Sequence, residues 1–376
     1  KYTFVWKKSV GKWEAKMYER IQEAVRLLNQ EYLCQFCVGE ETRTGDLQEI
    51  CRFLEEKCKV DGTLFVHGRG KRKSRNQRYQ ELFRRFLERQ TIYDWHTASF
   101  QGRNNYCKTD PDATFMHMKD DHMRNAQLKP GYNVQIAVDS EYIVATDIFQ
   151  DRNDVWTLVP FLKDMETKLG FRYPSVTADS GYESEEVYEY LSGAKQKPYI
   201  KPQTYEKWKK RSFKKDISKR ENMRYDEAAD TYTCHAEKEL RAVSVRKQKS
   251  KSGYQSEVTV YECEDCSGCP YKEKCTKAKG NKKLYLSKNF LKKRQESYEN
   301  IRSEKGILYR MNRTIQVEGA FGVLKNDYEF QRFLLRGKTR VKLEILLLSL
   351  GYNLNKLHAK IQNGRTGSHL FEVKSA

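Results

Sequence analysis

Four cysteines are crowded into a short stretch in the second half of the chain. They follow the spacing C-x2-C-x2-C-x5-C and are Cys263, Cys266, Cys269 and Cys275. Four thiolates at this spacing can surround a single ion, so the pattern predicts a structural site for Zn2+. An iron–sulfur cluster and reduced cysteines without a ligand are the alternatives.

A second cysteine pair, Cys34 and Cys37, stands alone, with no partner pair at a suitable spacing. This isolation favours thiols packed in a core over metal ligands. Three histidines also lack convincing partners in the sequence, which predicts structural or solvent-exposed side chains. They are His67, His117 and His122.

Asp179 closes the short apolar segment Ser175–Ala178 and precedes Gly181. A carboxylate in this position can project beyond the edge of a sheet into a cleft, where it could bind a divalent cation. An Asp at the end of a strand can equally cap a turn. The sequence therefore offers Asp179 as a candidate catalytic residue with a structural alternative.

Glu318 lies beside an apolar stripe that helical spacing predicts at Val317, Phe321 and Leu324. An acid at the border of such a stripe could hold a metal ion against a sheet, with Arg313 and Lys325 available for phosphates. Intrahelical salt bridges to the same two cations are the alternative.

Beyond Glu318 the chain carries cations interleaved with the aromatic residues Tyr328, Phe330 and Phe333. Cations neutralise phosphates and aromatic rings stack on exposed bases, so this composition is typical of a nucleic-acid contact. A solvated face with a few core aromatics is the alternative. The cations are Lys325, Arg332, Arg336, Lys338 and Arg340.

Several of these segments resemble the motifs of bacterial DDE transposases, and their wording is most similar to the insertion-sequence eleven-eighty-two type. Residues 177–182 (TADSGY) look like the second Asp motif, and residues 316–322 (QVEGAFG) look like the Glu motif. Residues 109–113 (TDPDA), residues 129–133 (KPGYN) and the cysteine run are also shared. The resemblance covers nearly the whole chain.

This resemblance implies an RNase H-like fold in which three carboxylates hold two divalent ions, Mg2+ or Mn2+. It implies strand cleavage by water and strand transfer by the released 3′-hydroxyl. Asp179 and Glu318 would be two of the three ligands. Lys325 matches the Lys that follows the Glu, whereas Thr314 stands in the usual Arg place and Arg313 lies one residue away.

The first catalytic Asp of the family lies in an Asp-Gly-Thr strand just before a segment like residues 2–8. It is therefore expected upstream of Lys1, and the chain as given is expected to be an inactive or truncated transposase. Asp61-Gly62-Thr63 lies in the wrong place to replace it. Asp112 and Asp139 are predicted to be turn residues.

The alternative function is a non-catalytic, DNA-binding remnant of a transposase, and a further one is a zinc-stabilised RNA-binding protein. All of these interpretations suit the composition, in which 71 Lys and Arg face 51 Asp and Glu, a net charge of +20. Such an excess favours a polyanionic partner. The partner expected is double-stranded DNA, namely terminal inverted repeats and target DNA, bound by a homodimer.

No stretch of the sequence is long and apolar enough for a membrane span, and the N-terminus shows no hydrophobic signal core. The expectation is a cytoplasmic, nucleoid-associated protein without a membrane partner. Cysteines crowded as in the C-x2-C run also fit a reducing compartment better than disulfide pairing.

These candidate residues require elements to position them. Apolar residues at helical spacing predict an amphipathic helix from Trp13 to Leu28 and a second helix around residues 47–54, followed by a basic run at residues 68–75. Alternation predicts a β-hairpin over residues 132–149 that turns at Asp139-Ser140. A helix capped by Asn153 is predicted to end at Gly170.

Further along, residues 175–178 and 198–200 are predicted strands, with a helix capped by Ser184 between them. A strand is predicted at residues 258–261. Helix is predicted to resume near Glu304, and residues 341–357 should form a helix with Val341, Ile345, Leu348 and Tyr352 on one face.

The predicted fold class is α/β, an RNase H-like mixed sheet flanked by helices, with a helical N-terminal insertion and a cysteine-rich inserted module. Five segments are predicted. They are a charged helical insertion with the start of the core (1–105), the core with Asp179 (106–204), the basic cysteine module (205–300), the C-terminal core helices with Glu318 (301–362) and a tail (363–376).

Overall fold

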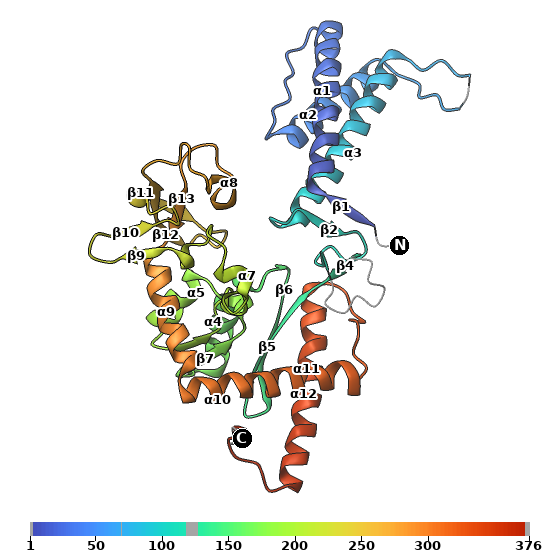
Figure 1. The fold of residues 1–376 in the computed structure, drawn as a ribbon. Coiled ribbons are helices and arrows are strands. Elements are labelled where there is room, and N and C mark those ends of the chain that lie inside the picture. Colours follow the sequence, from blue (N-terminus) through green and yellow to red (C-terminus); the bar gives the residue numbers. More distant parts are fainter. Residues whose placement is uncertain (1–2, 69, 118–126, 373–376) are drawn as a thin grey trace. The chain divides into compact units, whose positions relative to one another are not determined.

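The computed structural model describes residues 3–68, 70–117 and 127–372 and shows a mixed α/β protein (Figure 1). The chain divides into two compact units. The helical unit comprises residues 1–132 and 335–340, and the core unit comprises residues 133–334 and 341–376. The five-part division made from the sequence stays a prediction.

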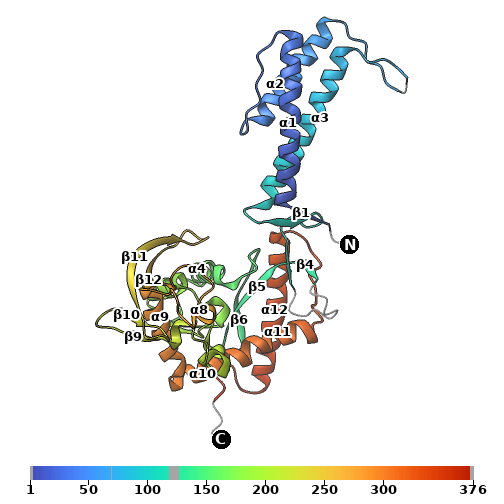
Figure 2. The same ribbon diagram turned by 45° about the horizontal axis from the view of Figure 1, so that its top comes forward.

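Three helices build the helical unit, and they lie side by side in Figures 1 and 2. They are α1 (Lys7–Tyr32), α2 (Arg43–Val60) and α3 (Arg75–Phe100). Their shared core contains the predicted stripe from Met17 to Leu28 together with Leu47, Ile50 and Leu54 of α2. Trp13 departs from the prediction, because its side chain is 56% exposed.

The basic run at residues 68–75 links α2 to α3, and Arg69 lies outside the described residues. Ser74 caps α3 by accepting a hydrogen bond from the backbone N–H of Gln77. The unit also holds two antiparallel strand pairs. They are β1 (Phe4–Trp6) with β2 (Asn105–Cys107), and β3 (Thr114–His117) with β4 (Leu128–Gly131).

The turn at residues 109–113 holds the distant segment 335–340 inside the helical unit. The backbone N–H of Gly337 donates to Asp110 at 3.2 Å, and that of Lys338 donates to Asp112 at 2.8 Å. The Tyr132 hydroxyl also donates to Asp110. Asp112 lies in a turn, as predicted, and its side chain accepts a backbone hydrogen bond there.

The core unit begins with an antiparallel hairpin, β5 (Asn133–Asp139) and β6 (Tyr142–Phe149). The turn residues are Ser140 and Glu141, both with left-handed φ values of 50° and 70°. The predicted turn at Asp139-Ser140 is therefore one residue early, because Asp139 still pairs with Tyr142 in the ladder.

Alternating helices and strands follow the hairpin, as predicted. Asn153 caps a 3-10 turn, η1 (Asp154–Trp156), which leads into α4 (Leu158–Leu169) and the left-handed Gly170. The strands β7 (Ser175–Ala178) and β8 (Lys197–Ile200) are parallel, with η2 (Ser180–Tyr182) and α5 (Glu185–Gly193) between them. Ser184 caps α5 through the Val187 N–H.

The hairpin and the parallel pair form two separate two-stranded sheets that share one hydrophobic core. Ala137 of β5, Ala145 of β6 and Val176 of β7 all pack against it. Its buried members come chiefly from the facing helices and are Leu158, Leu162, Met165, Val187, Tyr188, Leu191 and Ile200. One core therefore fixes the end of β7, where Asp179 lies.

After β8 the chain forms an antiparallel sheet of five strands in the order β13-β12-β11-β10-β9. Its strands are β9 (Arg224–Asp226), β10 (Thr231–Thr233), β11 (Glu239–Lys249), β12 (Gln255–Cys263) and β13 (Lys283–Leu286). Short helices accompany them, namely α6 (Tyr205–Trp208), α7 (Arg211–Lys214), η3 (Arg220–Asn222) and α8 (Lys272–Cys275). The predicted strand at residues 258–261 lies within β12.

The C-terminal part of the core unit is helical. Its segments are α9 (Lys288–Arg302), α10 (Glu304–Arg313), a π-helical stretch (Thr314–Glu318), α11 (Gly319–Gly322), a second π-helical stretch (Val323–Asp327) and α12 (Lys338–Gln362). Figures 1 and 2 show α10 and α11 continuing as one helical rod. No described helix is long and apolar enough to cross a membrane.

Candidate catalytic site and cysteine pocket

Asp179 directly follows β7, as the sequence predicts, and its two carboxylate oxygens have different partners. One oxygen accepts a hydrogen bond from the backbone N–H of Ser180 at 2.8 Å. The other lies 3.7 Å from the guanidinium of Arg313, at the end of α10. The Asp179 side chain is 53% exposed, so both the turn-capping role and access for a ligand are compatible with its position.

The loop after Asp179 is held against the hairpin by a polar network. The Tyr182 hydroxyl bonds Gln135 of β5, and Gln135 and Asn133 both donate to Asp154. A Cβ added at Gly181 would lie 3.3 Å from the Asp154 carboxylate, so only glycine allows this close approach without displacing Asp154. Sequence reasoning missed Asp154, because it follows the helix cap Asn153.

The pKa of the Tyr182 phenol depends on the charged side chains around this network. Burial raises the pKa of Tyr182, the carboxylates of Asp154 and Asp179 raise it further, and Arg313 lowers it. All three charged side chains therefore lie close enough to act on one phenol. The loop thus gathers two carboxylates and one guanidinium at the end of β7.

The same loop is fastened on its other side by Glu183, whose side chain is only 1% exposed. Glu183 accepts hydrogen bonds from the Tyr188 hydroxyl at 3.1 Å and the Gln203 N–H at 2.8 Å. Its closest approach to Arg294 of α9 is 2.9 Å. Burial raises the pKa of Glu183, and these partners oppose the rise.

Glu318 lies on the rod formed by α10 and α11, and the predicted apolar stripe beside it is right at Leu324 but one residue off at Val317 and Phe321. The buried positions are Gln316, Ala320 and Leu324, whereas Val317 and Phe321 are half-buried and Glu318 is exposed. The π-helical turn explains the shift, because i→i+5 bonding changes the period on which the prediction rested.

Gln316 fixes this rod to the hairpin, since its side chain accepts the Glu141 N–H at 3.2 Å. Arg313 precedes the π-helical turn and Glu318 ends it. Residues five apart lie near one another on a π turn, so Glu318 follows Arg313 along the rod. Asp179 thus contacts the rod that bears Glu318 through Arg313.

Within the described ranges, no group of three or more His, Cys, Asp or Glu side chains is positioned to hold a metal ion. The oxygen atoms of acids such as Asp179 and Glu318 are nevertheless the kind of donor that Mg2+ prefers. Asp61, of the Asp-Gly-Thr segment at residues 61–63, directly follows α2 in the helical unit and accepts a hydrogen bond from Asn76.

The predicted DNA-contacting cations divide between the two units. Arg313, Lys325 and Arg332 belong to the core unit, whereas Arg336, Lys338 and Arg340 belong to the helical unit. All are exposed except the half-buried Arg313. Phe330 and Phe333 pack edge to face at 5.2 Å, so part of the aromatic set is engaged with itself.

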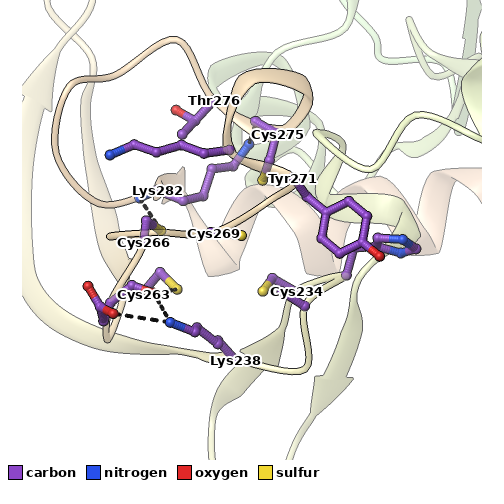
Figure 3. A pocket seen from close by; sticks show the side chains of 13 residues that line it. Cys234, Lys238, Cys263, Cys266, Cys269, Tyr271, Cys275, Thr276 and Lys282 are labelled. Carbon is purple, nitrogen blue, oxygen red and sulfur yellow. Dashed lines mark hydrogen bonds and ion pairs between the residues drawn. The ribbon is translucent and has the colours of Figure 1, made fainter.

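The predicted cysteine cluster lines one pocket next to the five-stranded sheet (Figure 3). Cys263 and Cys266 are buried, and Cys269 and Cys275 are half-buried. Burial, together with a hydrogen bond to Cys266, raises the pKa of the Cys263 thiol to about 12. Soft sulfur donors of this kind fit Zn2+. A fifth cysteine, Cys234, also lines the pocket, although its spacing in the sequence did not indicate this.

The second cysteine pair and the three histidines were also given predictions from the sequence. Cys34 is half-buried and Cys37 is exposed, so the expectation of core thiols is wrong, because both follow α1 in an irregular segment. His67 and His117 are exposed, as one of the predicted alternatives has it. His122 lies outside the described residues.

A comparison with protein families matches residues 233–358, about a third of the chain, to the model described as the transposase DDE domain. Comparisons with curated proteins and with solved structures find no match. The matched segment contains Glu318 and the cysteine run and excludes Asp179. It supports the transposase class, whose substrate is DNA. More narrowly, it supports the DDE transposase family.

Proposed function

We propose that this protein is a DDE transposase polypeptide of the insertion-sequence eleven-eighty-two type, with an RNase H-like core, in which Asp179 and Glu318 are metal ligands for DNA strand cleavage and strand transfer. The observation that carries this proposal is the 3.7 Å approach of Arg313 to Asp179. Arg313 belongs to the rod that bears Glu318, so residues far apart in the sequence meet at one sheet edge.

Two divalent ions, when bound, would activate the attacking oxygen and stabilise the leaving oxygen of a phosphodiester. The residues of this chain would bind and orient the reactants. Asp179 and Glu318 supply anionic oxygen donors, and Arg313 is placed to exchange its contact with Asp179 for a contact with phosphate. The network of Tyr182, Gln135 and Asp154 would hold the Asp179 loop still.

We propose in addition that this polypeptide binds DNA without cutting it. The support is the net charge of +20, which suits binding to DNA whether or not the chain cleaves it. Two carboxylates attract a divalent cation less strongly than three, because each anionic oxygen contributes to the binding free energy. A non-catalytic DNA-binding remnant is thus the second candidate function.

A DNA assay on the full chain tests both candidates. The substrate is a labelled duplex carrying the sequence that flanks the gene, with a scrambled duplex and the corresponding RNA as controls. Binding should weaken steeply as salt rises, because released counterions drive it. In Mn2+ or Mg2+ the flanking duplex should stay uncut. Preference for RNA would contradict the proposal, and specific cutting would contradict the inactivity.

Metal binding tests the two acids directly, independent of cutting. In titrations with Mn2+, Asp179→Asn and Glu318→Gln should each lower the affinity about tenfold or more, by removing a ligand. Asp139→Asn is the matched control, because Asp139 is an exposed acid at the end of β5. Equal affinities for all three variants would contradict the assignment of Asp179 and Glu318.

We also propose a homodimer, supported by an apolar stripe on the exposed side of α12. Its residues are 41–60% exposed and recur at alternating spacings of four and three, namely Leu343, Leu347, Leu350, Leu354, Leu357 and Ile361. This spacing is typical of helices that pair. Light scattering should show a dimer that Leu350→Glu with Leu354→Glu converts to a monomer, and an already monomeric wild type would contradict it.

We propose that the cysteine pocket binds Zn2+, and that the protein acts on DNA in the bacterial nucleoid.

For the DNA surface, we propose contacts from Lys325, Arg332, Arg336, Lys338 and Arg340. Each phosphate contact removed should reduce the slope of log affinity against log salt by about 0.9. An unchanged slope after replacement by Gln would remove that residue from the proposed surface.

A further inference from the structure

Cys234 lies directly after β10, in the turn that leads to β11. Its backbone N–H donates to Lys238 at 2.9 Å, and its carbonyl accepts from Glu237 at 3.0 Å. Glu237 has a left-handed φ of 55°, which closes the turn tightly. Far from the C-x2-C run in sequence, Cys234 is thus held in a defined position at one end of the sheet.

The strand register carries this turn to the cysteine run. Leu240 of β11 pairs with Cys263 at the end of β12, and the Glu264 N–H donates to Glu239 at 3.1 Å. The Lys238 ammonium then donates to the Asp265 carbonyl at 2.8 Å. Antiparallel pairing therefore places the Cys234 turn beside the loop that contains the other cysteines.

The pocket is lined by five cysteines, Cys234 among them (Figure 3). In the close-up, the sulfur atoms of Cys234, Cys263 and Cys269 point into the same space. All five are free thiols. Cys234 thus shares one pocket with all four cysteines of the run.

Lysines also line the pocket, among them Lys238 and Lys282. Lys282 is 8% exposed, and its ammonium donates to the carbonyls of Ser218 and Cys275, while its backbone N–H donates to the Cys266 sulfur at 3.3 Å. Lys238 lies near Cys263 and Cys269. Four thiolates around Zn2+ carry a net charge of about −2, which these cations would offset.

We infer that Cys234 is a ligand of the proposed Zn2+ site, so that the ion ties the β10–β11 turn to the loop after β12. Zn2+ takes four thiolates, and each thiol releases its proton to solvent on binding. One of the five cysteines is then left outside the coordination sphere. The sulfurs must draw together around the ion, since the described thiols do not form a ready metal site.

The inference rests on the proposed zinc site and is tested on the full chain with Zn2+ and Co2+. Cys234→Ser should lower the Zn2+ affinity, measured against a chromophoric chelator, by tenfold or more, and Cys263→Ser should do the same. It should also weaken the thiolate-to-Co2+ charge-transfer band. Cys37→Ser is the matched control, because Cys37 is exposed in the helical unit. Wild-type affinity and band intensity in Cys234→Ser would overturn the inference.

A measurement on the unaltered protein guards against a variant that fails to fold. Alkylation followed by mass spectrometry should show Cys234 protected by Zn2+ and modified after chelation, with Cys37 modified in both states. Equal modification of Cys234 with and without Zn2+ would overturn its role as a ligand. If the wild-type protein binds no Zn2+, both the proposed zinc site and the role of Cys234 as its ligand are contradicted. DNA cleavage results test neither of these two proposals.

Discussion

Replacing Arg294 by Met should destabilise the core unit by removing the buried partner of Glu183. The two side chains are 12% and 1% exposed, so little water can replace the lost guanidinium. Breaking a buried ion pair from one side costs about 3–5 kcal/mol. Tyr188 and Gln203 still donate to Glu183, which favours the lower end, about 3 kcal/mol.

Thermal unfolding measures this loss. For a unit of this size, about 3 kcal/mol corresponds to a fall in Tm of about 6–12 °C. The matched control is Arg241→Met, because Arg241 is 71% exposed in its pair with Glu239 and should contribute about 0.5 kcal/mol or less. Equal Tm losses for the two variants would refute the argument that burial makes the Glu183 pair important.

The pH dependence supplies a second check on Arg294→Met. Burial already raises the pKa of Glu183 above its ordinary 4.5, and loss of Arg294 raises it further. The folded state then binds a proton that the unfolded state releases. The stability lost on Arg294→Met should be complete above the pKa of Glu183 in the folded variant, and the loss should shrink as pH falls through that pKa. A loss of stability that does not depend on pH would contradict this. The double variant Glu183→Gln with Arg294→Met should lose less stability than the sum of the losses in the two single variants.

Three further changes test other parts of the fold. Phe83→Ala should cost about 3–5 kcal/mol in urea unfolding, because Phe83 is fully buried, and a cost below about 1 kcal/mol would contradict its place in the core. Ser184→Ala should cost about 1 kcal/mol by removing the cap of α5, visible as faster amide exchange at its first turn. Burial raises the pKa of Glu141, but Lys356 and Lys360 lower it more, so the net shift is downward. Glu141→Gln should therefore be less stable than wild type at neutral pH, with the difference vanishing as pH falls below the ordinary value of 4.5 and through the folded-state pKa.

Local features of the fold could be predicted from the sequence because their causes are local. Asn153 and Ser184 cap helices through their own side chains, Gly170 ends α4 in a left-handed conformation, and alternation marks the hairpin. The position of Asp179 after a short apolar strand could be predicted for the same reason. The π-helical turn before Glu318 could not, because nothing in a regular apolar period indicates a change of hydrogen-bonding step.

Features that depend on pairing between distant segments could not be predicted from the sequence. Cys234 has no cysteine at metal-ligand spacing, and only the register of β11 on β12 brings it to the pocket. Asp154 looked like part of a helix start, whereas the approach of Gly181 and the hydrogen bonds from Asn133 and Gln135 place it beside the Asp179 loop. Trp13 shares the helical period of its buried neighbours, yet more than half of its side chain stays open to solvent, at 56% exposure.

Residues 335–340 belong to the helical unit although residues before and after them belong to the core unit. The polypeptide therefore passes between the units at three peptide links, after Tyr132, Leu334 and Arg340. A single proteolytic nick at any of these links cannot release either unit as a free fragment. Deleting residues 1–132 would also remove Asp110 and Asp112, stranding the Gly337 and Lys338 amides without their acceptors. Severing every covalent link between the two units accordingly requires cuts at all three of these positions, which no simple truncation achieves.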